Sequence, residues 1–304
     1  MRMTVNQPDG MRPLIARASR AATVAAFCMG AGMMDTRTAT ASTSEAATVR
    51  FSTIEGAGGQ ALLDLVATVS PTLAAAYVRG GYGDLRGRGV LAATDEPLVG
   101  VAALTAMGGA ERALNVQIEA AINAGVTVAE LELMITQLAA YRGFHRAVDA
   151  MAVLQRVAAA RGLLPDDTES GVAESDDARY AVGAEVYTAL DAEALANIRR
   201  AFDDMAPDLA GTTFRIFGDV FARPGLDLRR RQIATVAALA AMGGADPQLR
   251  FHIAAALNVG VSRDEIVEIM MLLQLHAGMP AAYNGLVAAK AVFEQTGERT
   301  PAYR

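Results

Sequence analysis

The strongest constraint in this sequence is an internal repeat. The segment Val101–Ala110 recurs as Val236–Ala245, 135 positions later, with nine of ten residues identical. The same offset holds without a gap from Gly83 to Val157. Self-similarity over this length predicts two copies of one structural unit in tandem.

Each copy is predicted to be helical. Apolar residues make up 52% of the chain, many of them alanine, whereas aromatic residues make up only 5% and tryptophan is absent. Alanine, leucine, methionine, glutamate and arginine are strong helix formers. No window alternates apolar and polar residues with a period of two, so we predict no strand. The expected fold class is all-α, a tandem duplication of one helical unit.

Capping signals mark the helix starts. Thr127–Glu130 and Ser262–Glu265 are capping boxes, in which a hydroxyl and a glutamate satisfy free amides of the first turn. The predicted helices run over 61–78 with an interruption at 70–71, 97–107, 111–124, 129–142, 146–160, 180–205, 263–277 and 281–295. The glycines at 80–83 are predicted to break the helix, and 86–94 to be a loop.

The first 41 residues are typical of a signal peptide. A basic start precedes the apolar run Ala21–Met34, and Ala39–Ala41 has the small residues of a cleavage site. We expect an exported protein, periplasmic or secreted, cut near Ala41; the alternative is an unstructured leader with Met11 as the true start. Repeat 1 is then expected over 60–160, an acidic linker over 161–178 and repeat 2 over 179–297.

Composition argues against several kinds of function. Cys28 is the only cysteine and lies in the leader, so a cleaved chain has no thiol for catalysis or disulfides. The net charge of −6, without a basic arm, argues against nucleic-acid binding. The three histidines, His145, His252 and His276, lack the spacing of a metal site, so we expect no metal.

A polar residue recurs on a helix face that is otherwise apolar. His252 lies in the helix that starts at Asp246-Pro247, and its counterpart in the first copy is Gln117. Either a shared cavity or a hydrogen-bonded core residue explains this pattern. A histidine in a cavity can exchange protons near neutral pH without a metal.

Arg231 ends a run of three arginines at a helix start. As a charged run, 229–231 is expected to face solvent, with at most one side chain pointing inward, where a guanidinium can bind a carboxylate. The first copy has Thr94, Asp95 and Glu96 at these positions, so its site is expected to be degenerate.

Several motifs together resemble the carboxymuconolactone decarboxylase family, which shares its all-helical fold with the alkylhydroperoxidase D proteins. The second copy carries Phe217–Val220, Arg223–Leu226, Leu249–His252, Gly260–Ile266 and Ala277–Ala282. The first copy carries Tyr82–Asp84, Val101–Ala110, Gly125–Thr127 and Ile135–Phe144.

The resemblance implies a lyase that removes carbon dioxide from 4-carboxymuconolactone without a metal or an organic cofactor. Arg231 and His252 match the family's arginine and histidine positions, with His276 expected nearby. We therefore expect His252, Arg231 and His276 to be catalytic, and Arg250 and Gln232 to contact a small carboxylate or lactone substrate.

The family's other chemistry, thiol-based peroxide reduction, is not expected. Its paired cysteines correspond to Ala245 and Gln248, and its acidic relay residue to Gln232. The resemblance also implies a homo-oligomer, a trimer for a tandem chain. A different class of function stays open: an exported binding or assembly protein that keeps the fold without turnover.

Overall fold

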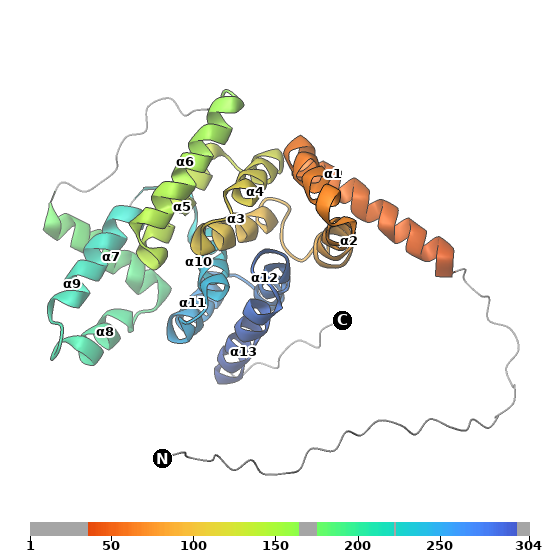
Figure 1. Ribbon diagram of the computed structural model, residues 1–304. Coiled ribbons are helices and arrows are strands. Elements are labelled where there is room, and N and C mark those ends of the chain that lie inside the picture. The colour runs from red at the N-terminus through yellow and green to blue at the C-terminus, as the bar shows by residue number, and fades with distance from the viewer. Residues whose placement is uncertain (1–35, 164–174, 222, 297–304) are drawn as a thin grey trace, which may run out of the picture.

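The computed structural model describes residues 36–163, 175–221 and 223–296, and all regular structure in these ranges is helical (Figure 1). The all-α prediction is confirmed. The first half contains α1 (Thr36–Val69), α2 (Pro71–Ala76), the π-helix η1 (Tyr77–Leu85), α3 (Glu96–Met107), α4 (Glu111–Asn123), α5 (Val128–Arg142) and α6 (Phe144–Ala160). The second half contains α7 (Asp176–Leu190), α8 (Ala194–Phe202), α9 (Asp208–Phe221), α10 (Leu228–Met242), α11 (Asp246–Asn258), α12 (Arg263–His276) and α13 (Met279–Gln295).

Two equivalent helices, α3 and α10, form the centre of the molecule. They pack against each other, and a continuous stretch of each is buried, Pro97–Ala106 in α3 and Arg231–Ala240 in α10. Their alanines bring the two backbones close together, and one continuous apolar core includes side chains from both repeats. The two copies therefore share a single core, which buries more apolar surface than two separate units of this size would.

An ion-pair network joins the repeats at one end of this core. Both predicted capping boxes are present. The capping glutamates also pair with arginines at the start of α10, Glu130 with Arg230 and Glu265 with Arg229. Both arginines bind Asp95 at the start of α3, with Arg230 Nε 2.9 Å from Asp95 Oδ1. Arg229 and Arg230 therefore form ion pairs between the repeats instead of facing solvent as predicted.

The glycines at 80–83 do not break the helix as predicted. They lie within η1, and Gly81 is buried against Leu275 of α12. A Cβ atom on Gly81 would lie 2.8 Å from Leu275 Cδ1, closer than such atoms approach in proteins. These glycines permit close packing between the repeats.

Both repeats begin with a lead-in helix, although the sequence predicted one only for the second. α1 starts at Thr36, well before the expected boundary at 60, and bends at Gly56, where φ is 60°. Ala47 and Phe51, one helical turn apart, are buried against η1. This apolar spacing was hidden by a composition rich in serine, threonine and alanine. The predicted second lead-in over 180–205 is divided into α7 and α8 near Asp191.

Most of the predicted signal peptide, residues 1–35, lies outside the described residues, as does 164–174 of the acidic linker. The expected cleavage position, Ala41, falls in the first turns of α1. Among the described helices, none is both long enough and apolar enough to cross a membrane.

Candidate functional site

Two buried polar clusters lie beside the central helices. The second-repeat cluster comprises Arg231, Gln232 and His252, together with Gln137 and Tyr141 from α5. The first-repeat cluster comprises Glu55, Tyr82, Arg86 and Gln117, together with His276 from α12. Each cluster is therefore completed by the helix that follows the capping box of the other repeat.

His252 is the buried base of the second-repeat cluster. Its side chain is 2% exposed, and its Nδ1 lies 2.9 Å from Gln232 Oε1. The ring of Tyr141 meets the imidazole edge-on, with 5.0 Å between centroids. Burial lowers the pKa of His252 to about 3, so the imidazole is neutral at pH 7. A neutral ring that donates from Nδ1 to Gln232 keeps Nε2 as an acceptor.

Arg231 points inward, as expected for one arginine of the run, but main-chain oxygens occupy most of its donors. Nε donates to Leu226 O and Nη2 to Arg223 O, both at 3.0 Å, and Nη1 donates to Gln137 Oε1 at 3.1 Å. The guanidinium also stacks over Phe221, 5.0 Å from the ring centroid. Burial lowers the pKa of Arg231 to about 10, so the charge persists at pH 7. Arg231 holds the segment between α9 and α10, and few donors remain for a carboxylate.

The two predicted substrate contacts lie in different places. Gln232 belongs to the cluster and is fully buried, and within the described part of the chain its Nε2 has no hydrogen-bond partner. Arg250 lies at the surface with its side chain 39% exposed, where its Nε pairs with Asp246 Oδ2 at 2.7 Å. Arg250 is therefore outside the cluster, because its side chain lies on the solvent-facing side of α11, whereas the side chain of His252 lies on the inner side.

His276 is not beside His252, where the sequence placed it. Its Nε2 lies 3.5 Å from Arg86 Nη2 in the first-repeat cluster, and Tyr141 takes the corresponding position beside His252. The reason is the packing of α12 against α3 of the other repeat. Burial, assisted by the charge of Arg86, lowers the pKa of His276 to about 3, so this imidazole is also neutral at pH 7.

Arg86 organises the first-repeat cluster. Its side chain is 1% exposed, Nη2 donates to Gln117 Oε1, and Gln117 Nε2 donates to Glu55 Oε1 at 2.7 Å. The Tyr82 hydroxyl donates to the same carboxylate oxygen. Glu96 Oε1 lies 3.7 Å from Arg86 Nη1. A guanidinium and a carboxylate are thus bridged by an amide inside the protein.

This cluster is incompletely hydrogen-bonded. Arg86 Nε, Arg86 Nη1 and Glu55 Oε2 are buried and have no hydrogen-bond partner among the residues that the structure describes. A buried donor without a partner costs about 1–3 kcal/mol, more when it is charged. Such groups are unusual in a merely structural cluster and are a reason to look for a ligand.

The sequence did not predict this first-repeat cluster, and the expectation of a degenerate site in the first repeat stays a prediction. In the first repeat the position equivalent to Arg231 is occupied by Glu96, which has the opposite charge. The buried guanidinium comes instead from Arg86, whose counterpart is Phe221. Arg86 follows η1 as its C-cap in an extended conformation, and its guanidinium carbon lies 5.3 Å from the centroid of the Tyr82 ring.

A cavity of about 420 Å³ adjoins Arg86. It is enclosed by α1, the loop after η1, the start of α3 and the end of α4. Its lining includes Arg50, Ile54, Arg86, Leu91 and Glu96. The first-repeat cluster thus has an adjacent space that can hold a ligand.

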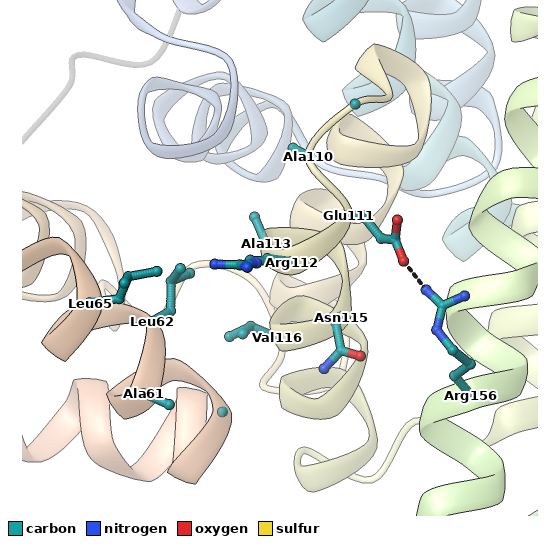
Figure 2. A pocket seen from close by; sticks show the side chains of 12 residues that line it. Ala61, Leu62, Leu65, Ala110, Glu111, Arg112, Ala113, Asn115, Val116 and Arg156 are labelled. Atoms are coloured by element: carbon teal, nitrogen blue, oxygen red, sulfur yellow. Dashed lines mark hydrogen bonds and ion pairs between the residues drawn. The ribbon is translucent and has the colours of Figure 1, made fainter.

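A larger cavity, of about 870 Å³, lies between α1 and α4 (Figure 2). Apolar side chains such as Leu62, Leu65 and Val116 line it, Arg112 points across it, and Glu111 pairs with Arg156 at its edge. It contains no residue of either cluster, so it is not the candidate site.

These features define an all-helical tandem-repeat protein with a buried arginine and a neutral histidine in each of two clusters. The sequence model described as "Carboxymuconolactone decarboxylase family" matches residues 71–156 and 207–291, one segment in each repeat. The chain belongs to the carboxymuconolactone decarboxylase family.

Individual relatives agree with this assignment. The chain is 35% identical over 127 residues to a 4-carboxymuconolactone decarboxylase of Acinetobacter baylyi, an alignment that covers 40% of this chain and 92% of that protein. It is 32% identical over 101 residues to an uncharacterised 15.0 kDa protein of Paracoccus denitrificans, covering 33% of this chain and 75% of that protein.

A solved structure shares the fold of most of the chain. It is a crystal structure from Burkholderia xenovorans LB400, provisionally described as a gamma-carboxymuconolactone decarboxylase subunit. The match has a TM-score of 0.51 with 19% sequence identity and covers 84% of this chain and 98% of the other.

Proposed function

We propose that this protein is a carboxy-lyase that decarboxylates a small carboxylated lactone or a related oxo acid without a cofactor, and that the reaction takes place at the first-repeat cluster. One observation carries the proposal: a buried guanidinium, two of whose nitrogens make no hydrogen bond to the described residues, lies beside a neutral imidazole and next to a cavity. Family membership, and a relative named as a decarboxylase, supply the reaction class.

The chemistry needs a positive charge and a proton. When the carbon–carbon bond to the carboxylate breaks, carbon dioxide leaves and the bonding electrons pass into the neighbouring carbonyl group as an enolate. A fixed cation in a water-poor site stabilises that negative charge much more than it would in water. We assign this role to Arg86, which Gln117 and Glu55 hold in place.

The enolate carbon must then be protonated. His276 Nε2 lies 3.5 Å from Arg86 Nη2, and the neutral imidazole can pass a proton from solvent to the enolate by giving up one proton and taking another. His252, which matches the family's histidine position and is held by Gln232, is the second candidate for this role.

The test measures carbon dioxide release from 4-carboxymuconolactone and from a short 3-oxo acid by the purified chain. His276→Gln is expected to lower kcat roughly 10²- to 10⁴-fold, as for the loss of a general acid, whereas His252→Gln leaves kcat nearly unchanged. Glutamine is a conservative choice for His252 because Gln117 stands at the equivalent position.

Two results would contradict the proposal. If the unmodified chain releases no carbon dioxide from either compound, these substrates are ruled out and the binding or assembly function becomes the better hypothesis. If His252→Gln abolishes activity while His276→Gln keeps it, the reaction belongs to the second-repeat cluster.

Export and assembly are part of the same proposal. We propose that the chain is exported, that it is cut near Ala41 and that it forms a trimer. The intact mass of protein recovered from the producing cell, and light scattering of that material, test both. A mature chain that still begins at Met1, or a monomer in solution, would contradict them.

A further inference from the structure

We propose that a third cavity, enclosed by α3, α4 and α6 and called here the Arg146 cavity, binds a small phosphate monoester through Arg146 and Thr105. None of the described residues that line it belongs to either polar cluster. The Arg146 cavity is therefore a separate site, and its ligand is independent of the proposed lyase reaction.

The Arg146 cavity has the size and the mixed wall of a small-molecule site. Its volume is about 370 Å³, near the lower end of the range for such sites. Leu104, Leu114 and Val153 contribute apolar surface, whereas Thr105 and Arg146 contribute polar groups. Such a wall suits a ligand that is apolar in one part and charged in another.

Thr105 is the clearest sign of a missing partner. Its side chain is 2% exposed, and its hydroxyl makes no hydrogen bond to any residue that the structure describes. Most buried polar groups have a hydrogen-bond partner, so an unpaired hydroxyl in a cavity wall indicates a group that the protein does not supply. A threonine hydroxyl can donate one hydrogen bond to an oxyanion.

Arg146 supplies a positive charge beside that hydroxyl. In the described part of the chain, no hydrogen bond or ion pair joins Arg146 to another residue. Its guanidinium lies against the end of α3, where Gly108 has a φ of 67° and where a Cβ atom would overlap with the Arg146 side chain. Gly108 therefore makes room for the guanidinium, whose donors stay available to a ligand.

The donors come from different sides of the cavity. Thr105 lies on α3 and Arg146 on α6, and the start of α4 forms a further part of the wall. The N-cap residue of α4, Ala110, makes no side-chain cap, and a helix start carries a partial positive charge. Donors on several sides suit a tetrahedral phosphate group better than a planar carboxylate, whose two oxygens lie in one plane.

Two carboxylates also line the cavity. Glu111 pairs with Arg156 at the edge, so these two charges balance each other (Figure 2). Asp149 lies three residues after Arg146 on α6 and brings a negative charge near the proposed ligand. Asp149 is therefore expected to limit the affinity for an anion.

The second repeat has a matching but smaller cavity, of about 180 Å³. Every described residue in its wall is the counterpart of a residue in the wall of the Arg146 cavity. Ala240 and Ala281 stand in place of Thr105 and Arg146. A Cβ atom on Gly243, the counterpart of Gly108, would meet no other group within 4 Å. The hydroxyl and the guanidinium are thus particular to the first repeat, and the fold does not require them.

The test is calorimetric titration of the full chain with phenyl phosphate, inorganic phosphate and benzoate. Phenyl phosphate is expected to bind at least about tenfold more tightly than either of the others, because only it combines an apolar ring with a tetrahedral anion. No binding of phenyl phosphate, or equally tight binding of inorganic phosphate or benzoate, would overturn the inference.

Three variants place the ligand, and each introduces the residue that the second repeat has at the same position, so the fold should be kept. Arg146→Ala should weaken phenyl phosphate binding at least about tenfold and Thr105→Ala about threefold, since each removes a hydrogen bond to a charged group. Asp149→Asn should strengthen it about threefold.

Arg250→Ala is the matched control, because it removes a surface arginine outside the cavity and should leave the affinity unchanged. If Arg146→Ala and Thr105→Ala both bind phenyl phosphate as tightly as the unmodified chain does, the ligand lies elsewhere and the inference fails.

Carbon dioxide release, measured on the unmodified chain, separates the two proposals. Phenyl phosphate binding that depends on Arg146, without turnover, leaves the Arg146 cavity as a site and removes the lyase. Turnover without phenyl phosphate binding leaves the lyase and removes the inference.

Discussion

The two clusters differ at one pair of equivalent positions. In the second repeat the pair is Phe221 and Arg231, and the guanidinium stacks on the ring and binds main-chain oxygens. In the first repeat the equivalent residues are Arg86, at the position of Phe221, and Glu96, at the position of Arg231. The arginine thus stands at the other position of the pair, and its Nη1 lies 3.7 Å from Glu96 Oε1. Duplication has kept a buried guanidinium in both halves while changing its partners. The second-repeat arginine stabilises a chain segment, and the first-repeat arginine has donors left for a ligand.

The lead-in helices differ in a similar way. Gly218 of α9 and Gly83 of η1 are equivalent residues. A Cβ atom on Gly218 would overlap with the Arg179 carbonyl of α7, whereas a Cβ atom on Gly83 would lie 3.5 Å from Ala47 Cβ, an ordinary contact. The second repeat is tightly packed at this point, and the first has room beside α1.

The largest expected effect tests the difference in packing between the two lead-in helices. Gly218→Ala should lower the free energy of unfolding by about 3 kcal/mol, because a main-chain oxygen cannot give way as a side chain can. Gly83→Ala should change it by less than about 1 kcal/mol, and in the stabilising direction if the alanine favours the helix. Urea unfolding of both variants measures the difference; equal losses would show that the two lead-in helices pack alike.

Lysine substitutions compare the two arginines. Arg231→Lys should cost about 2–3 kcal/mol, since a single ammonium cannot replace the fork of donors that binds Leu226, Arg223 and Gln137. Arg86→Lys should cost about 1 kcal/mol, because Arg86 has fewer bonds to lose. Denaturant unfolding at pH 7 tests the order, and a larger loss for Arg86→Lys would reverse the roles assigned here.

The buried histidines predict a pH dependence. The pKa of His252 is about 3 in the folded chain and about 6.5 in the unfolded chain, so between these values the unfolded chain binds more protons. Stability should therefore fall as the pH drops from 6.5 towards 3, by at most about 1.4 kcal/mol per pH unit from this residue, and it should not change with this residue above 6.5.

His252→Gln isolates that contribution. The variant should lose stability less steeply than the unmodified chain between pH 6.5 and pH 4, and the difference in slope belongs to His252. Parallel pH profiles from chemical unfolding would mean that folding does not lower the pKa of His252.

The smallest expected effect concerns a residue that the sequence placed in the site. Arg250→Ala removes a surface pair with Asp246 and should change stability by less than about 0.5 kcal/mol. Carbon dioxide release should also be unchanged. A tenfold loss of activity would return Arg250 to the substrate site.

The sequence predicted what depends on local signals. The helical class and both capping boxes follow from residues close together in the chain, and the duplication follows from one constant offset. Arg231 was singled out only through the family resemblance. Glu55 and Arg86 were missed because the two repeats were compared residue by residue at a constant offset. The buried arginine of the first repeat lies at a different position, so this comparison did not find it. His276 was misplaced because α12 reaches across to the other repeat, a tertiary contact without any local signature.

The most direct test of this account uses the chain's three histidines as reporters. With ¹³Cε1-labelled histidine, the spectrum contains one imidazole signal each from His145, His252 and His276, assigned from single glutamine variants. The account predicts that 4-carboxymuconolactone shifts the His276 signal and leaves the His252 signal in place. A shift at His252 alone, or no shift at either residue, would contradict a ligand site in the first repeat completed by α12.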